Sequence, residues 1–518
     1  MLNVLLKKKY GINYQKIVIN TDHAQLFIMS AFLAILDPLG EKIRFSDSSL
    51  TKYFPDGDKF QSTRGSPFKT AATNIYKTKD GRYYHIHGGM NTSPVQKALG
   101  INPNEVADYT RGCEIYQSKI SELTAKELDT LMNDQYRQAG TICWSIDEYI
   151  ASEHGKANAH VGLFEVHHVP NPKQAPSWWT PVEGRTNAER PLFGLKVIDL
   201  TRVIASPAVT RELAELGASV MRITSPNVTD LTFLLSDLAW GKWNAYLDLT
   251  KPEDRATLRG LIEESDVVVD GYRPGVMQKW GFGKDDILGF FKEKERGVVY
   301  VHENCYGWNG PWAHRSGWQQ ISDACCGVSM EYGRAMGNDE AVTPLLPNSD
   351  HCAQSTGAAG ATGALQALIE RSEKGGSFVV DARKNLTSKS TRTKSFLIQV
   401  ALNYYSQWLV NSCSTYPPEI WDALWTRYGS PIFRHTDNML ITLPPLLGML
   451  ASHQAPILNP SFFEIRDNRA IGVPVRTIRP ILTFPEGAVK LGYNIGSRGN
   501  GVDQPVWPED LMEEIVKV

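Results

Sequence analysis

The chain has 518 residues, and its 54 basic and 56 acidic side chains leave a formal net charge of −2. Its length exceeds one ordinary hydrophobic core, so two or more domains are expected. The balanced charge provides no strong field for nucleic acid or an anionic membrane, which argues against both as partners and favours a small molecule or a protein. Seven cysteines are too sparse for a disulfide scaffold and have no metal-binding spacing.

The N-terminus shows no targeting pattern. The apolar run MLNVLL turns basic too early for a signal peptide. The sequence contains no uninterrupted apolar stretch of about 18 residues. We therefore expect a soluble, cytoplasmic protein, with a mitochondrial or peroxisomal location left open.

The N-terminal third predicts a helical segment, a small α/β module and a linker. An apolar helix with capping residues at 21–24 lies within 1–60, which we interpret as the remnant of a first, incomplete large domain. In 61–170, IYKTKDGRYYHIHG alternates as a β-hairpin that turns at Asp80–Gly81, TSPVQKALGI predicts a short helix, and helical spacing runs through 119–153. Residues 171–190 are rich in proline and predict an extended linker.

From Leu192 onwards, strand and helix patterns alternate. LKVIDL, PAVTRELAELG and SVMRIT form one βαβ unit, and NAYLDL, PEDRATLRGLIEES, DVVVDGY and GVVYVHENCY continue the alternation. This pattern predicts an α/β fold in which 191–381 forms a doubly wound, Rossmann-like parallel sheet. Residues 400–518 would add helices and a return segment. No GxGxxG follows the first strand, so no dinucleotide is expected, and we predict neither a cofactor nor a metal.

Short repeats indicate a partial internal duplication. NTDHA around Asp22 resembles NSDHC around Asp350, and GLFEVHHV at 162–169 resembles SFFEIRDN at 461–468, in the same order. The segment 382–399 lies between Asp350 and the repeat at 461–468. It carries five basic and no acidic residues and interrupts apolar sequence on both sides. We interpret it as an insertion. A disordered loop, a translated piece of unspliced message and an ordinary basic surface loop remain as alternatives.

In the stretch Val342 to Ile369, Asp350 is predicted to lie at the start of a helix rich in small residues. Pro344 and Pro347 keep the approach extended, and Asp350 is a capping residue type. The glycine-rich run that follows predicts close backbone packing. A carboxylate at a helix N-terminus meets free N–H groups and the positive end of the dipole, so it can act as a nucleophile or a base. A cap with no chemistry is the alternative.

Four blocks in this order resemble the class III coenzyme A (CoA) transferases, the CaiB/BaiF family, which includes formyl-CoA transferase and α-methylacyl-CoA racemase. The blocks are PLFGLKVIDLTRVIASPAVTRELAELGASVMRI, WGKWNAYLDLTKPEDRATLRGLIEESDVVVDGYRPGVMQKWGFG, GWNGPWAHRSGW and NSDHCAQSTGAAGATGAL. The resemblance is clearest over 190–372 and looser over 62–190 and 400–518. It implies that Asp350 attacks an acyl-CoA thioester, carries CoA as an enzyme-bound thioester and passes it to another carboxylic acid.

The resemblance also implies that CoA is a substrate held at strand ends. The candidate contacts are Val203, Ile204, Ala205, Arg222, Lys242, Tyr272, Arg273, Pro274, Gly275, Trp318 and His351. Alternatives stay open: Arg222 and Lys242 as solvated charges, 273–275 as a plain turn, and His351 as a surface or capping side chain.

Three departures from the family pattern bear on function. Ile204 stands where transferases often have a glutamine, Trp318 stands where racemases have a histidine, and the flexible glycine loop is reduced to 62–66. The alternatives to CoA transfer are an acyl-CoA racemase or epimerase and an inactive CoA-binding relic. Family members close the site between the large domain of one chain and the small domain of its partner, so a homodimer or an intrachain pseudo-dimer is implied.

Overall fold

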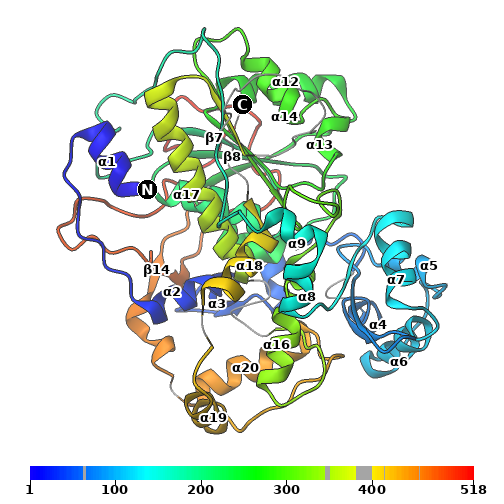
Figure 1. The fold of residues 1–518 in the computed structure, drawn as a ribbon. Helices are drawn as coiled ribbons and strands as arrows, with labels where there is room; N and C mark the ends of the chain where they lie inside the picture. The colour runs from blue at the N-terminus through cyan, green and yellow to red at the C-terminus, as the bar shows by residue number, and fades with distance from the viewer. Residues whose placement is uncertain (62–65, 345–350, 381–399, 414, 454, 518) are drawn as a thin grey trace.

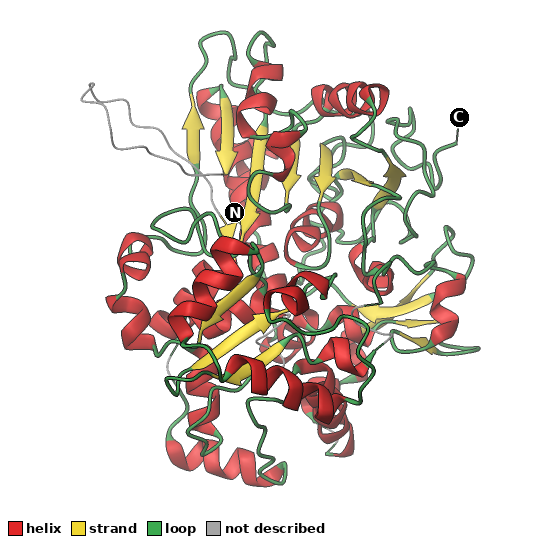
Figure 2. Cartoon of the chain, turned by 90° about the vertical axis from the view of Figure 1, so that its right-hand side faces the viewer, coloured by secondary structure: helices red, strands yellow, loops and turns green. Residues whose placement is uncertain are grey.

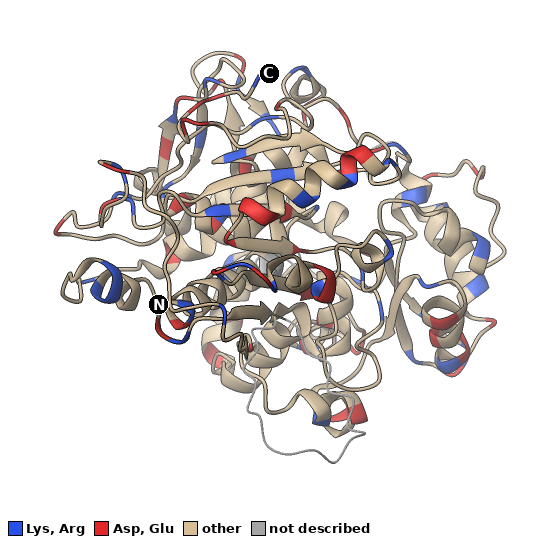
Figure 3. Cartoon of the chain, turned by 90° about the horizontal axis from the view of Figure 1, so that it is seen from above, with Lys and Arg blue, Asp and Glu red and all other residues tan. Residues whose placement is uncertain are grey.

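The computed structural model describes residues 1–61, 66–344, 351–380, 400–413, 415–453 and 455–517, and it describes 351–353 by their backbone alone. The described part forms three sheets with helices packed around them (Figures 1 and 2). None of its helices combines the length and apolar character needed to cross a membrane. Acidic and basic residues are interspersed along the ribbon in Figure 3.

The largest sheet has 8 strands, in the order β6-β12-β11-β10-β7-β8-β9, with β13 also paired to β11. All neighbouring strands are parallel except β6 and β12, which are antiparallel. The predicted α/β class is therefore confirmed as a mixed, largely parallel sheet. Its strands are β6 (His167–Val169), β7 (Lys196–Leu200), β8 (Ser219–Thr224), β9 (Lys242–Tyr246), β10 (Val267–Asp270), β11 (Val299–Asn304), β12 (Ser377–Val380) and β13 (Val400–Ala401).

Four helices cover the two faces of this sheet: α10 (Ala205–Glu215), α12 (Pro252–Glu264), α14 (Lys284–Phe291) and α17 (His351–Lys374). Val197 and Val267 join one core with α10 and α17. Ile198 and Val268, their neighbours along the strands, join the opposite core with α12 and α14. Successive side chains of a strand point to opposite faces, and both faces here are buried, so a run such as Val267–Val269 is apolar throughout.

Helices α10 and α17 lie unusually close together because α17 carries glycines where they meet. A Cβ on Gly357 would lie 2.4 Å from the Cβ of Ala208 and 3.0 Å from the carbonyl oxygen of Ala205. A Cβ on Gly360 would lie 2.7 Å from Val209. The close packing predicted from the small-residue run is thus confirmed.

Strands β12 and β13 lie in line along β11, although 381–399 separate them in the chain. Val380 is the partner of Val301, and Val400 is the partner of Glu303. Only the position opposite His302 lies between them. The register is therefore that of one continuous strand with a single residue between Val380 and Val400, which supports the interpretation of 382–399 as an insertion.

The small module contains a three-stranded antiparallel sheet of β3 (Asn74–Lys77), β4 (Tyr83–His87) and β5 (Ala139–Ile142). The predicted hairpin is confirmed, because Asn74 pairs with Ile86 and Lys77 with Tyr83. The helical spacing predicted through 119–153 is wrong at β5, where pairing with β4 overrides it. The helices of the small module are α4 (Pro67–Thr70), α5 (Ser93–Ala98), α6 (Tyr109–Ile120), α7 (Ala125–Asp129) and a π-helical turn (Thr130–Gln135).

The N-terminal 60 residues and the C-terminal region share a sheet in the order β14-β15-β1-β2. Its strands are β1 (Ile35–Leu36), β2 (Ile43–Arg44), β14 (Phe463–Arg466) and β15 (Val475–Ile478), and the helices before it are α1 (Leu2–Tyr10), α2 (Thr21–Ile28) and α3 (Ser30–Leu33). Residues 1–60 are therefore not only helical, because β1 pairs with its neighbour β2 and with β15, a strand remote in sequence. The capping side chain of α2 is Asn20 rather than a residue of 21–24.

The remaining α-helices of the described chain are mostly short. They are α8 (Ile146–Ala151), α9 (Glu153–Asn158), α11 (Leu235–Leu238), α13 (Val276–Lys279), α15 (Gln319–Cys325), α16 (Val328–Ala335), α18 (Leu402–Ser412), α19 (Pro418–Arg427) and α20 (Met439–Ser452). Residues 171–190 contain neither helix nor strand.

Candidate functional site

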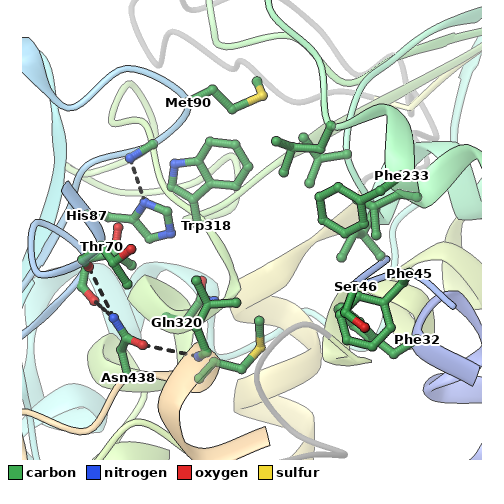
Figure 4. Close-up of a pocket in the computed structure, with 18 of the residues that line it drawn as sticks. Phe32, Phe45, Ser46, Thr70, His87, Met90, Phe233, Trp318, Gln320 and Asn438 are labelled. Carbon is green, nitrogen blue, oxygen red and sulfur yellow. Dashed lines mark hydrogen bonds between the residues drawn. The ribbon is translucent and has the colours of Figure 1, made fainter. Parts of the chain in front are cut away.

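A cavity of about 570 Å³ lies where the small module meets the start of α10. Chain segments far apart in sequence line it. Figure 4 shows Phe32, Phe45 and Phe233 on one side, and on the other a wall that we call the polar wall, with His87, Trp318, Gln320 and Asn438. The lining residues are Phe32, Phe45, Ser46, Ser48, Thr51, Asp56, Thr70, Thr73, His85, His87, Gly89, Met90, Val203, Ile204, Leu231, Phe233, Leu234, Trp318, Gln320, Thr343, Asn438, Met439 and Leu440. Val203, Ile204 and Trp318 were predicted site residues.

The loop after β7 holds Val203 in a strained backbone conformation. Its φ is 71°, in the left-handed region that β-branched residues rarely adopt. Such strain costs about 1–3 kcal/mol and tends to occur at functional sites. Ile204, the N-cap of α10, offers no capping side chain, so Ala205 and Ser206 begin the helix without a side-chain partner for their N–H groups.

His85 and His87 lie on the same face of β4, as their spacing predicts, with ring centroids 6.4 Å apart. The ring of His87 stacks on Trp318 at 5.0 Å, and its Nδ1 accepts a hydrogen bond from the Gly89 N–H at 2.9 Å. Burial, reinforced by neighbouring His85, holds the pKa of His87 well below its usual value, so this imidazole is neutral. No group of three or more metal-binding side chains occurs in the described part of the chain.

Asn438 lies at the other end of the polar wall, and the sequence did not indicate it as a site residue. Its Nδ2 donates to the carbonyl oxygens of Thr70 at 3.1 Å and Thr73 at 3.2 Å, and its Oδ1 accepts from the Leu440 N–H. This amide therefore joins the start of α20 to the small module. An Asn before a helix is a capping signal, but the partners across the cavity could not be read from the sequence.

Arginine side chains from three segments approach one another beside the cavity. A Cβ on Gly89 would lie 3.7 Å from a guanidinium nitrogen of Arg273 and 3.8 Å from the Trp318 ring. Partial burial lowers the pKa of Arg273, and the positive charges of Arg202 and Arg137 lower it further. Neither Arg273 nor Arg137 forms an ion pair within the described part of the chain. We call Arg137, Arg202 and Arg273 the arginine rim; the sequence had pointed to Arg273 alone.

The loop that carries Arg273 also has the geometry of a turn. Tyr272 donates its N–H to Asp270 at 2.9 Å, and Gly275 is the N-cap of α13 with a φ of 88°. The guanidinium of Arg202 lies 5.2 Å from the Tyr272 ring. Pro274 lies between these residues in the same turn. The loop is thus a turn, and it also carries Arg273 of the arginine rim.

Two predicted contacts, Arg222 and Lys242, are buried in ion pairs instead of lying free. Arg222 donates to Asp230 at 2.7 Å. Lys242 donates to Asp199 at 3.0 Å and to the carbonyl oxygen of Pro207 at 2.8 Å. Burial lowers the pKa of Lys242 to about 8, although Asp199 opposes the shift. Neither side chain lines the cavity, so the structure places both as internal supports, and the alternative of solvated charges is wrong.

Asp350 lies outside the described residues, as do 62–65, and the side chain of His351 is likewise undescribed. The residues on either side can be placed. Thr343 lines the cavity, and α17 begins at His351, close to the predicted helix start. The roles of Asp350 and His351 therefore stay predictions.

Comparison with known proteins identifies the family. The model of CoA-transferase family III matches residues 192–403. An acetyl-coenzyme A transferase, nodX, of Hypoxylon pulicicidum is 48% identical over 100% of this chain and 84% of its own length. An acyl-CoA transferase of Gibberella moniliformis is 34% identical over 70% of this chain and 63% of its own. The chain belongs to CoA-transferase family III, a family of transferases.

The solved structure of a CaiB/BaiF family protein from Brucella suis aligns with a TM-score of 0.32 and 21% identity, over 47% of this chain and 60% of its own.

Proposed function

We propose that this protein transfers CoA from one carboxylic acid to another through Asp350. The observation that carries the proposal is the arginine rim beside the cavity. Arg202 follows β7 and Arg273 follows β10, so both lie at the carboxyl ends of adjacent parallel strands, where open α/β sheets bind ligands. Guanidinium groups that have no carboxylate partner among the described residues suit the phosphates of CoA, and the neighbouring cavity suits the acyl group.

The strand order supports the finer interpretation of a doubly wound, Rossmann-like sheet. The chain runs outward from β7 to β9 on one side and then restarts at β10 on the other side of β7. Ligands bind in the crevice at such a reversal. The small module that closes this crevice belongs to the same chain, which supports an intrachain pseudo-dimer over a site shared between two chains.

In the proposed reaction, an oxygen of the Asp350 carboxylate attacks the thioester carbonyl. The carbon–sulfur bond of the resulting tetrahedral adduct then breaks, which releases CoA thiolate and leaves a mixed anhydride of Asp350 and the donor acid. The thiolate then attacks the aspartyl carbonyl, releasing the first acid as its carboxylate and leaving an aspartyl-CoA thioester. The acceptor carboxylate repeats the two steps in reverse order. The result is a new acyl-CoA and a free Asp350, with no net change in protons, water or electrons.

The developing oxyanion needs hydrogen-bond donors, and Ile204 cannot supply the side-chain amide that many transferases use. We propose that the uncapped N–H groups at the start of α10 serve instead. Ile204 and Val203 line the cavity, and the first N–H groups of a helix have no partner within it. The strained backbone at Val203 would hold this turn in place.

Asp350→Ala tests the proposal. We expect loss of the acyl-enzyme that hydroxylamine traps, with CoA binding by calorimetry largely kept. Undiminished turnover would refute it. Tight CoA binding without a trapped intermediate in the wild type would instead support an inactive relic. Deuterium incorporation at the α-carbon without CoA exchange would support a racemase.

A further inference from the structure

We infer that at least one of the two acids handled by this protein carries a large apolar body. The inference rests on the proposed function and concerns the acyl side of the same site. In a transferase the donor and acceptor acids occupy one acyl site in turn, so the cavity must accommodate the larger of the two. An acetyl group has only a few heavy atoms and would leave most of a 570 Å³ cavity unfilled.

The size of the cavity points to the size of the ligand. Pockets of roughly 300–1,000 Å³ bury most of a drug-sized molecule. A cavity lined by well-packed aromatic groups would be costly to maintain if only a small acid used it, because unfilled apolar space forfeits dispersion contacts.

The aromatic wall points to the chemistry of the ligand. Phe32, Phe45 and Phe233 lie together on one side of the cavity in Figure 4, and Leu231 and Leu234 line it as well. The ring centroids of Phe32 and Phe45 are 5.2 Å apart and those of Phe45 and Phe233 are 6.5 Å apart. This continuous apolar surface suits a hydrocarbon chain or ring.

Part of the polar wall is satisfied within the protein. His87 is already bonded through Nδ1 to the Gly89 N–H, and Asn438 uses both Nδ2 and Oδ1 within the protein. The Nε2 of His85 and the Oγ1 of Thr343, which also line the cavity, are buried without a hydrogen-bond partner among the described residues. We therefore expect the apolar acyl body to lie against the aromatic side chains rather than against these two atoms.

Calorimetry with free CoA, acetyl-CoA, dodecanoyl-CoA and naphthylacetyl-CoA tests the inference on the full chain. We expect at least one of the two large acyl-CoA probes to bind tenfold or more tightly than acetyl-CoA. The variant Leu231→Trp, which adds bulk inside the cavity, should abolish that gain and leave free CoA binding within twofold. Leu39→Trp makes the same substitution at an 81% exposed site and should keep the gain.

Ser46→Trp provides a second test at an exposed position of the cavity lining, in case the interior variant does not fold. It should also reduce at least fivefold the ratio by which the large acyl-CoA probe binds more tightly than acetyl-CoA. If free CoA and acetyl-CoA bind but neither large probe binds more tightly, the inference is overturned while the proposed function stands. If no CoA compound binds, the proposed function itself fails. A gain that persists in both cavity variants would place the acyl group elsewhere and overturn the inference.

Discussion

At the scale of single residues, Arg211 joins the N-terminal segment to the large sheet. Its guanidinium donates to Ser30 at 2.9 Å, to Gln354 at 3.1 Å and to the carboxylate of Asp237. Arg211 is only 1% exposed, so Asp237 is the main compensation for a buried charge. The four residues belong to α3, α10, α11 and α17, which pack around the approach to the site.

Asp237→Asn should reduce the free energy of unfolding by up to about 3–5 kcal/mol, because it removes the more buried of the two carboxylates beside Arg211 and leaves only Glu212, at 3.3 Å. Urea denaturation measures the change. Glu114→Gln removes a similar charge from an exposed ion pair with Arg111 and should cost about 1 kcal/mol or less. Equal losses in the two variants would show that Asp237 does not compensate Arg211.

His85 makes the stability depend on pH. It is 1% exposed, and its Nδ1 donates to the carbonyl oxygen of Ile86 at 2.8 Å. Burial lowers its pKa to about 4, against about 6.5 in the unfolded chain. Between these values the unfolded chain binds a proton that the folded chain does not, so stability should fall as pH falls from 6.5 to 4.

The contribution of His85 over that window should be about 3 kcal/mol, from 1.36 kcal/mol per pKa unit. Urea denaturation at pH 7 and pH 4.5 should therefore show a smaller acid loss for His85→Gln than for the wild type. His314→Gln changes an exposed histidine and should leave the acid loss unchanged. An identical pH profile for His85→Gln and the wild type would contradict the assignment.

At the scale of elements, Gly357 sets how closely α17 can approach α10. Gly357→Ala would gain up to about 1 kcal/mol of helix propensity. The new Cβ would nevertheless meet Ala208 at 2.4 Å and the backbone of Ala205 at 3.0 Å. We expect a net loss of about 1–3 kcal/mol in the free energy of unfolding, because neither neighbour can move aside without shifting α10.

Gly260 in α12 is the matched control, since a Cβ there would meet nothing within 4 Å. Gly260→Ala should stabilise the protein by up to about 1 kcal/mol in the same urea experiment. A stabilising effect at both glycines would contradict close packing of α10 and α17.

The pattern of elements was predictable where local sequence and tertiary pairing agree. The βαβ alternation from Leu192 and the hairpin at Asp80–Gly81 were confirmed, because apolar period and turn residues specify them locally. Strand β5 was missed because its residues continue a helical spacing, and only pairing with β4 makes them a strand. Strands β1 and β2 were missed because each is only two residues long and β1 joins the rest of its sheet through β15, hundreds of residues away.

At the scale of the whole molecule, the strand pairing of the large sheet does not require the segment 382–399. Removing 382–399 would place Asp381 opposite His302 and join Val380 to Val400 in the register that β12 and β13 already keep. We expect this deletion variant to fold, with an unchanged far-UV circular dichroism spectrum and an equal or higher free energy of unfolding, because closing a shorter loop costs less entropy.

Deletion of 382–398, one residue shorter, is the control. The extra residue would shift the strand by one position and turn its side chains to the opposite faces of a sheet that is buried on both sides. We expect this variant to be clearly less stable in urea. Equal stability of the two deletions would contradict a continuous strand at this position.

The candidate site was only partly predictable. Val203, Ile204, Trp318 and Arg273 were found because they lie in blocks that resemble one family. Arg137, Asn438 and the aromatic wall lie outside those blocks. The capping signal at Asn438 is local, but neither it nor anything near the other residues reveals the cavity. Arg222 and Lys242 look like surface charges in the sequence, yet their carboxylate partners Asp230 and Asp199 enclose them.

The sequence by itself determined the alternation of strands and helices, the closeness of α10 to α17 and the family, because apolar period, glycine placement and ordered blocks are local properties. Only the tertiary structure decided which remote segments enclose the cavity and which charges face it. The physical reason is that side-chain contacts across the cavity join 32–46, 70–90, 203–234 and 438–440, and no local pattern encodes such long-range neighbours.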